Sequence, residues 1–311
     1  MTPLSLAIVG YGKIARDQHH PAIDQHDGFT LSAIASRNGH VDGLPHFESL
    51  EALLESDEAI DAVSLCAPPS VRFEQAMAAM RAGKHVMLEK PPGATLSEIE
   101  ILKACAERQG VTLFASWHSR EAPGVARARA WLADKTVTGM HIEWKEDVTK
   151  WHPGQSWIWQ AGGLGVFDPG INALSIMTEI LPMEVYLHAS TLVFPANTQA
   201  PIAASLTFKD AGEHTLSAEF DWRQQGDELW NITIETDHGT LALSKGGSQL
   251  HIDGEQMLEQ DEREYPGLYQ RFFELIERGE CDVDVRPLRH VADAFMLGER
   301  TTVEAFHDPA A

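Results

Sequence analysis

The chain opens with an apolar run, Leu6–Val9, that passes directly into the pattern Gly10-x-Gly12-x-x-Ala15. The run is typical of a buried parallel strand, Gly10 permits a tight turn, and Gly12 lets the backbone approach a pyrophosphate. Ala15 is small enough for a helix to pack closely on the strand. The amides that would face phosphate at the helix N-terminus are those of Gly12, Lys13 and Ile14. Placed after the first strand of a strand–helix series, the pattern predicts a dinucleotide-binding site.

Strands and helices alternate through the first 120 residues. The further expected strands are Thr30–Ser36, Ala62–Cys66, His85–Leu88 and Thr112–Ser116. The expected helices are Leu50–Glu55, Val71–Ala82 and Thr95–Gln109, the last beginning with a capping box. This order predicts an α/β fold with a doubly wound parallel sheet. We therefore assign residues 1–120 to a dinucleotide-binding Rossmann domain.

The pattern changes in residues 121–311. Strand-like runs with short turns are expected at Met140–Lys145, Glu213–Trp222, Trp230–Thr236 and Gly239–Ser244. Helices are expected at Val125–Ala133, Pro169–Leu181, Leu268–Glu277 and Leu288–Thr302. Strands joined by short turns favour an open, mostly antiparallel sheet, so we expect a second α/β domain. We allow for a C-terminal helix that packs back on the first domain.

Net charge and cysteine content restrict the binding partners and the cellular compartment that we expect. The 311 residues carry 46 acidic and 24 basic side chains, a net charge of −22, which disfavours nucleic acid and anionic membrane surfaces. No apolar stretch approaches the roughly 20 residues of a membrane span, and we see no secretion signal. Cys66, Cys105 and Cys281 are scattered without metal-ligand spacing, so we expect a cytoplasmic protein with no metal site.

The end of the second strand reads Ser36-Arg37-Asn38 and lacks an acidic side chain. An acid at this position would accept hydrogen bonds from an unmodified ribose, whereas a hydroxyl and a guanidinium suit a 2′-phosphate. The sequence therefore favours NADP, with NAD as the second choice. The alternative is an exposed loop arginine without a ligand.

Two polar segments follow later strands of the same sheet. Glu89-Lys90-Pro91 ends the fourth strand and His118 follows the fifth, so both belong at the carboxyl edge, where open parallel sheets bind ligands. Lys90 can reach into a crevice there, and Pro91 can adopt a cis bond that fixes the turn. The alternatives are an edge turn with solvated charges and a structural histidine.

A second group of polar and aromatic residues follows the strand Met140–Lys145. Glu146, Trp151 and His152 are suited to a carbohydrate-facing wall, because indoles stack on sugar C–H faces while Glu and His bind hydroxyls. The alternative is a buried aromatic cluster, and we expect the later Trp157 and Trp159 mainly to pack.

Asp168 and Asn172 are four residues apart, so they share one face if a helix begins near Asp168. An aspartate can accept a proton, whereas an asparagine can only orient or hydrogen-bond. Both side chains could then face a cleft. Alternatively, Asp168 caps the helix.

At these residues the chain resembles the Gfo/Idh/MocA oxidoreductases (glucose–fructose oxidoreductase and inositol dehydrogenase relatives). The resemblance spans essentially the whole chain and rests on the glycine pattern, Glu89-Lys90-Pro91 and the Gly162–Asn172 stretch. It implies a Rossmann domain followed by a substrate-binding and oligomerisation domain, whose open sheet commonly builds a homodimer. Most of the family carries histidine where this chain has Asn172, so a histidine-based mechanism cannot be assumed.

Further segments resemble the bacterial L-arabinose/D-galactose 1-dehydrogenases of that family, among them Cys66-Ala67-Pro68-Pro69, Trp144–Val148 and Trp151–Gln155. The resemblance implies NAD(P)-dependent oxidation of a cyclic aldose, a neutral monosaccharide, at C1 to the lactone. We expect an acid–base pair of Asp168 and Lys90, favouring Asp168 as the base and leaving the opposite assignment open. The residues expected to bind sugar are His118, Glu146, Trp151, His152, Asn172 and Trp230. The residues expected to bind the cofactor are Gly10, Gly12, Lys13, Ile14, Ser36, Arg37, Cys66, Ala67, Pro68, Glu89 and Lys90.

Two alternatives remain. One is a dehydrogenase or reductase of another polyol or a keto-sugar. The other is a nonenzymatic NADP-binding regulator, which could keep the phosphate cradle while losing Lys90 or Asp168.

Overall fold

The computed structural model describes residues 2–261 and 263–308, which form two compact units. The first unit comprises Met1–His118 and Arg263–Val285, and the second comprises Ser119–Glu262 and Arg286–Ala311. The chain thus leaves the first unit, builds most of the second and returns once. The returning segment contains helix α8 (Glu264–Arg278), whereas the last helix, α9 (Arg286–Leu297), belongs to the second unit.

A six-stranded parallel sheet forms the centre of the first unit, with strand order β3-β2-β1-β4-β5-β6. The strands are β1 (Leu4–Val9), β2 (Phe29–Ala35), β3 (His46–Phe47), β4 (Ala62–Leu65), β5 (His85–Glu89) and β6 (Leu113–Ser116). This is the strand order of the Rossmann fold, in which the direction of winding reverses beside the first strand. The predicted doubly wound sheet is confirmed.

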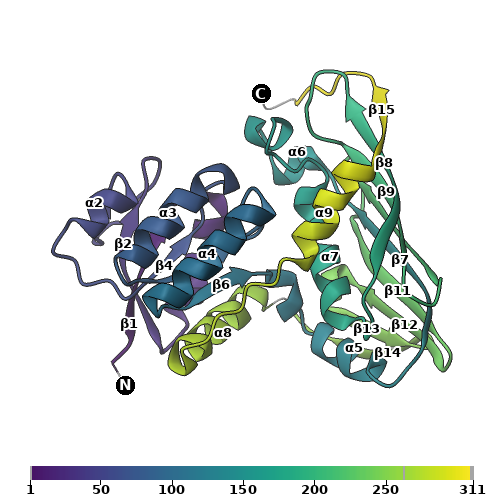
Figure 1. Ribbon diagram of the computed structural model, residues 1–311, viewed down its shortest axis with the longest axis horizontal. Coiled ribbons are helices and arrows are strands. Elements are labelled where there is room, and N and C mark those ends of the chain that lie inside the picture. Colours follow the sequence, from purple (N-terminus) through teal and green to yellow (C-terminus); the bar gives the residue numbers. More distant parts are fainter. Residues whose placement is uncertain (1, 262, 309–311) are drawn as a thin grey trace. The chain divides into compact units, whose positions relative to one another are not determined.

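Helices cover both faces of this sheet (Figure 1). They are α1 (His20–Asp24), α2 (Leu50–Leu54), α3 (Pro69–Arg81), α4 (Leu96–Gln109) and α8. Side chains alternate along β1, so Val9 joins a core with α2, α3 and α4, while Ile8 joins a core with α1 and α8. Phe272 of α8 is fully buried and stacks on Phe29 and Phe114, which ties the returning segment to the sheet.

The second unit is built on a nine-stranded sheet in the order β14-β13-β12-β11-β7-β10-β9-β8-β15. The strands are β7 (Val137–Lys145), β8 (Tyr186–Pro195), β9 (Ala203–Lys209), β10 (Thr215–Asp221), β11 (Leu229–Thr236), β12 (Gly239–Ser244), β13 (Gln249–Ile252), β14 (Glu255–Glu259) and β15 (Glu299–Val303). Its pairs are antiparallel except β7 with β10 and β8 with β15, so the expectation of a mostly antiparallel sheet is confirmed.

Helices α5 (Val125–Leu132), α7 (Phe167–Ile180) and α9 lie on one face of this sheet (Figure 1). A single-turn helix, α6 (Val148–Trp151), follows β7. Helix α7 is buried along almost its whole length, because it lies between α5, α9 and the sheet. The strands alternate accordingly: Ile232 and Ile234 are buried, whereas the neighbouring Thr233 and Glu235 are exposed on the opposite face.

One predicted helix is wrong at its end. The expected helix Leu288–Thr302 stops at Leu297, and residues 299–303 instead form β15 at the sheet edge. Gly298 lies at the break, where a side chain would meet the Ala294 carbonyl and Leu192. Thr301, Thr302 and the following valine are β-branched and suit a strand. Pairing with β8 therefore overrides the helical pattern read from sequence.

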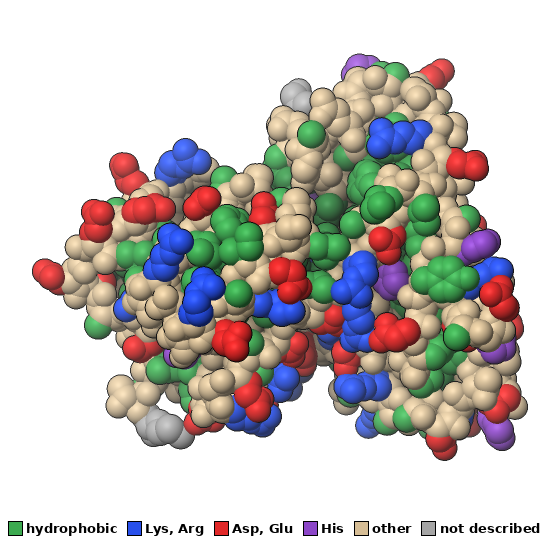
Figure 2. Space-filling model, in the orientation of Figure 1, with side chains coloured by type: hydrophobic (Ala, Val, Ile, Leu, Met, Phe, Trp, Pro, Cys, Tyr) green, Lys and Arg blue, Asp and Glu red, His purple; other side chains and the backbone are tan. Residues whose placement is uncertain are grey.

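Surface charge is mixed at close range. Figure 2 shows acidic and basic side chains interspersed on the visible face. Along the chain, Lys13 pairs with Asp17 and Lys209 pairs with Glu213. Among residues 2–261 and 263–308, no helix is long and apolar enough to cross a membrane.

Candidate active site

The ends of the parallel strands bring the predicted nucleotide-binding residues to one edge of the first unit. Gly10 follows β1, Ser36 follows β2, Cys66 follows β4, Lys90 follows β5 and His118 lies two residues beyond β6. In an open parallel sheet these positions border the crevice that binds ligands. The structure therefore assembles the expected set of first-unit residues along a single edge.

The glycine turn has the geometry of a phosphate cradle. Gly10 has a φ of +86°, and a Cβ there would lie 2.8 Å from the backbone nitrogen of Ala67, so the fold itself requires glycine. Gly12 has no such requirement, because no protein atom lies within 4 Å of an added Cβ. Lys13 and Ile14 are exposed beside it in the first helical turn. The open space at Gly12 fits a dinucleotide pyrophosphate.

The side chain expected at a 2′-phosphate is exposed and available. Ser36 is buried, and its hydroxyl accepts a hydrogen bond from the Asn38 amide at 3.3 Å. Arg37 is exposed, and its guanidinium forms no hydrogen bond or ion pair with any residue that the structure describes. An unengaged guanidinium beside a hydroxyl, with no acidic side chain at the end of the second strand, is suited to a phosphate.

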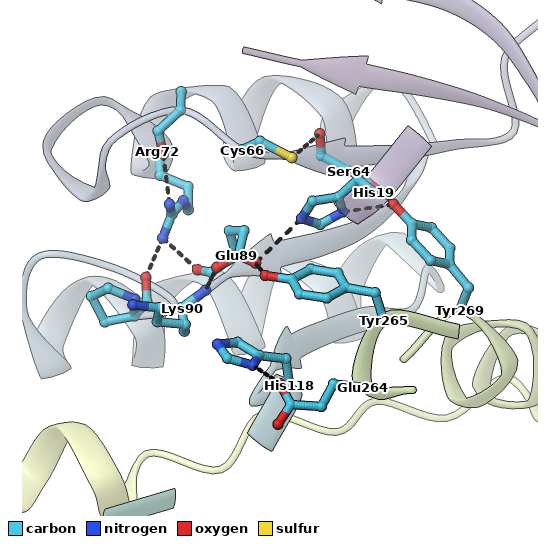
Figure 3. A network of polar contacts seen from close by, with 12 residues as sticks. His19, Ser64, Cys66, Arg72, Glu89, Lys90, His118, Glu264, Tyr265 and Tyr269 are labelled. Carbon is cyan, nitrogen blue, oxygen red and sulfur yellow. Dashed lines mark hydrogen bonds and ion pairs between the residues drawn. The ribbon is translucent and has the colours of Figure 1, made fainter. Parts of the chain in front are cut away.

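A buried carboxylate lies directly before Lys90 (Figure 3). Glu89 accepts three hydrogen bonds: one from the Lys90 backbone amide at 2.6 Å, one from the Tyr265 hydroxyl at 2.8 Å and one from His19 at 3.2 Å. His19 is itself fully buried, and its second nitrogen contacts the Tyr269 hydroxyl at 2.8 Å. Both tyrosines come from α8, so the returning segment completes the surroundings of the Glu89-Lys90 turn.

Burial and neighbouring charges have opposite effects on the pKa values of Glu89 and His19. Burial alone would raise the pKa of Glu89, but the hydrogen bond from His19 and the charges of His19, His118 and Lys90 lower the pKa to about 2. Burial opposes the charged form of His19, yet contacts with Cys66, Tyr269 and Glu89 raise the pKa of His19 well above its usual value. The pair is therefore an ion pair at neutral pH.

His118 is held by the same segment. Its Nδ1 contacts the Glu264 carboxylate, and its ring stacks on Tyr265 at 5.3 Å between centroids (Figure 3). Burial lowers the pKa of His118, but Glu264 and Glu89 outweigh burial and raise it. The imidazole is thus oriented by Glu264, and its protonated form is favoured more than in a free histidine.

A buried arginine joins two turns at this edge. The Arg72 guanidinium donates to the carbonyl of Ala67, at 2.6 Å, and to those of Glu89 and Pro91. The Lys90–Pro91 peptide bond is cis, as the sequence analysis allowed. Arg72 therefore fastens the turn that follows β4, which includes Pro68 at the N-cap of α3, to the turn that carries Lys90.

In the second unit, three strand ends bring a carboxylate and two indoles together. β7 and β10 run parallel, so Glu146 after β7 lies beside Trp222 after β10; β11 runs antiparallel and begins at the same edge with Trp230. The Glu146 carboxylate accepts one hydrogen bond from each indole, both at 3.1 Å. Burial raises the pKa of Glu146, and these two hydrogen bonds only partly offset it.

Asp168 is buried in the first turn of α7, and its carboxylate lies 3.2 Å from His152 Nε2. The alternative that Asp168 caps this helix is wrong, because the N-cap is Val166 and the helix already begins at Phe167. Asn172 lies one turn further along and is partly exposed. Its side-chain amide makes no hydrogen bond to the described residues, so it is available to a ligand.

The contacts of His152 determine where its protons lie. Trp157 Nε1 can only donate, so the atom that it meets at 3.2 Å is the Gln155 carbonyl oxygen. The same oxygen lies 3.3 Å from His152 Nδ1, which must therefore carry a proton. Nε2 lies 3.2 Å from the Asp168 carboxylate, so one proton joins these two atoms. The ionised form of Asp168 is the form that can accept a proton from a ligand.

The remaining predicted residue, Trp151, is fixed by a contact that sequence did not suggest. Its indole donates to Glu228 at 2.7 Å and lies 5.9 Å from the ring of Trp230. Trp159 packs on Trp222, in agreement with the packing role expected for it. Sequence analysis missed several residues that contact the predicted site residues or the turns that carry them: His19, Arg72, Trp222, Glu228, Glu264, Tyr265 and Tyr269.

The comparisons with known proteins agree with this architecture. Residues 4–116 match the profile of the Gfo/Idh/MocA group, described as an oxidoreductase family with an NAD-binding Rossmann fold. A galactose 1-dehydrogenase of Pseudomonas fluorescens is 47% identical over 308 residues, which cover 99% of this chain and 100% of that protein. The chain belongs to the Gfo/Idh/MocA family of oxidoreductases.

Solved structures extend the comparison to the whole fold. A D-galactose-1-dehydrogenase from Rhizobium etli superposes with a TM-score of 0.95 at 58% identity and covers 99% of each chain. A 3-ketoreductase from Actinomadura kijaniata, 19% identical, has a TM-score of 0.82 and covers 97% of this chain and 99% of its own, which shows a common fold.

The two cradle glycines should respond differently to substitution by alanine. We expect Gly12→Ala to keep the stability of the wild type within about 0.5 kcal/mol, because no protein atom is displaced, but to lose NADP and NAD binding. Gly10→Ala should destabilise the fold by at least about 1 kcal/mol through its positive φ and the clash with Ala67. Thermal unfolding and tryptophan-fluorescence titration measure the two effects. Unchanged dinucleotide binding by Gly12→Ala would rule out this glycine turn as the phosphate-binding site.

The depressed pKa of Glu89 predicts an acid-sensitive contribution to stability. The ionised group stabilises the fold fully above its ordinary pKa of 4.5, and this stabilisation is lost as the pH falls towards about 2. The contribution is on the order of 3 kcal/mol. Glu89→Gln should be less stable at pH 7 and should show a shallower loss between these pH values in urea unfolding. Glu48→Gln, at an exposed position, is the control; identical pH curves for Glu89→Gln and the wild type would contradict the ion pair.

Proposed function

We propose that the protein is an NADP-dependent sugar dehydrogenase that oxidises a cyclic aldose, D-galactose or L-arabinose, at C1 to the aldonolactone, with NAD as a second cofactor. The observation that carries this proposal is the buried Asp168, which is paired with His152 and lies one helical turn before Asn172. It occurs in a chain that matches a galactose 1-dehydrogenase along its full length.

The chemistry requires a base at the anomeric hydroxyl. The oxidised nicotinamide, when bound, accepts the hydride from C1. The hydroxyl proton must leave at the same time, to a group within about 2.6–3.2 Å. We assign this role to Asp168, which is paired with His152, and assign Lys90 to orienting the hydroxyl. The opposite assignment, with Lys90 as the proton acceptor, is distinguished by the pH profile of variants.

The remaining sugar hydroxyls are bound by side chains that contacts within the protein already orient. Each Glu146 oxygen receives one indole N–H and keeps lone-pair capacity for a hydroxyl. Asn172 offers a donor and an acceptor, and His118 is a further hydroxyl partner. His152 acts on the sugar through Asp168, because its two ring nitrogens already meet Gln155 and Asp168. Trp151 and Trp230 supply apolar faces for sugar C–H groups or for the nicotinamide.

The pocket is not expected to discriminate strongly between the two sugars. D-galactopyranose and L-arabinopyranose share ring stereochemistry and differ in the substituent at C5. One hydroxymethyl group is worth roughly 1–3 kcal/mol of discrimination. Both sugars should therefore be oxidised.

The assembly and location are also proposals. The exposed face of the second sheet presents small and polar side chains, such as Ser205, Thr207 and Thr233, which are suited to a homodimer. On that face, one possible metal-ligand atom from each of His141, Glu143 and Glu219 lies within 4.8 Å of the other two. Lys145 Nζ, however, lies 3.0 Å from both carboxylates and occupies the place of a cation. Three free cysteines fit a reducing cytoplasm.

The function is tested by assaying a panel of aldoses with NADP and NAD, following absorbance at 340 nm and trapping the lactone as a hydroxamate. We expect Asp168→Asn and Lys90→Met to lower kcat by about 10²–10⁴-fold, because each removes a group at the reacting hydroxyl. Asp227→Asn and Lys103→Met, at exposed positions, are the matched controls. Near-normal turnover by Lys90→Met would exclude Lys90 from the acid–base pair. An unchanged rate and pH profile for Asp168→Asn would exclude Asp168 from it.

The same panel separates the alternatives. Reduction with a polyol but no trapped lactone would favour a dehydrogenase of another substrate class. NADP binding without sugar-dependent reduction would favour a regulator.

Arg37 should determine the cofactor preference. We expect Arg37→Gln to raise the KM for NADP by about 10–100-fold, which is the loss of one charge-assisted contact, and to leave the KM for NAD nearly unchanged. Arg81→Gln, exposed at the end of α3, is the control. Equal losses for both cofactors would overturn the assignment of Arg37 to the 2′-phosphate.

A further inference from the structure

The last described residues of the chain, Phe306–Asp308, are fastened to the loops beside the sugar-binding residues of the second unit. The side-chain amide of Asn197 binds the Phe306 backbone at both ends, donating to its carbonyl at 2.7 Å and accepting from its amide at 2.9 Å. Asp308 accepts a hydrogen bond from the Gly154 amide at 2.7 Å. Gly154 lies two residues after His152, so this bond holds the turn that follows the histidine.

Ring contacts continue from this segment into the site. Phe306 packs on Trp159 at 5.2 Å, and Trp159 packs on Trp222 at 5.2 Å. Trp222 is fully buried, lies 5.3 Å from the ring of His152 and donates to Glu146. Three successive ring contacts therefore connect the C-terminal segment to His152. The Trp222 indole, which takes part in two of these contacts, also donates to Glu146.

We propose that Phe306–Asp308 is a positioning segment for the sugar pocket. It braces Trp159 and the Gly154 turn, so that His152 stays against Asp168 and Trp222 stays against Glu146. Because the rings and the backbone turn are rigid, a displacement at Phe306 moves groups at the pocket although the segment touches no substrate. The inference rests on the proposed function of that pocket.

A groove beside the segment is better explained by this role than by a ligand of its own. Trp159, Gln160, Thr198 and Phe306 line part of it. Two of its amides are used within the protein: both ends of Asn197 bind Phe306, and Gln199 accepts from the Ala161 amide at 2.9 Å. These two amides therefore hold the loops and the C-terminal segment together.

The test compares Phe306→Ala and Asp308→Ala with His307→Ala. His307 lies between them, is exposed and makes no hydrogen bond or ion pair with the described residues. We expect each of the first two variants to raise the KM for D-galactose by about tenfold, since small misplacements of binding groups are costly, with the KM for NADP unchanged. Phe306→Tyr and Asp308→Asn keep the ring and the acceptor and should restore wild-type values.

Amide hydrogen exchange in residues 152–160 provides a readout that does not depend on activity. Exchange there should be faster in Phe306→Ala and Asp308→Ala than in His307→Ala, with thermal midpoints of Asp308→Ala and the wild type alike. Exchange and KM values equal to those of His307→Ala would overturn the proposal. If the wild type oxidises no aldose, the proposed function fails, and the exchange comparison still decides whether the segment positions the loop.

Discussion

The architecture of the nucleotide-binding edge depends on one buried carboxylate. Glu89 ends β5 and accepts hydrogen bonds from the Lys90 backbone, from His19 in the first helical turns and from Tyr265 in α8. A buried charge is costly unless it is paired and hydrogen-bonded, and here three donors converge on it. The same interaction thus fixes the backbone of Lys90 and ties the returning segment to the Rossmann sheet.

The second unit also buries carboxylates, but their partners are indoles and an imidazole. Glu146 is buried against two indole N–H donors, while Asp168 is buried against an imidazole. The two carboxylates therefore have different surroundings: burial raises the pKa of Glu146, which meets two indoles, whereas Asp168 lies beside the His152 imidazole. Such a difference allows neighbouring acids to take different roles, one binding hydroxyls and the other accepting a proton.

Sequence predicted the strand ends better than their partners. The rule that ligands bind at the carboxyl edge of a parallel sheet placed Gly10, Ser36 and Lys90 together without any contact being known. The partners were missed because they are distant in sequence: His19 and Tyr269 are 250 positions apart, and Trp222 reaches Glu146 only because β7 and β10 are parallel neighbours. Neither pairing has a local signal. The end of the predicted helix after Leu288 failed for the same reason, since pairing with β8 is not visible in local periodicity.

Oxidation of a sugar at C1 passes its hydrogen to the cofactor and its hydroxyl proton to the protein, and the two fates can be followed separately. The most direct measurement uses D-galactose deuterated at C1 and mass spectrometry of both products. We expect deuterium in the reduced nicotinamide and none in the lactone. Deuterium retained in the sugar product, with unlabelled reduced nicotinamide, would mean oxidation at another carbon and would contradict the proposed reaction.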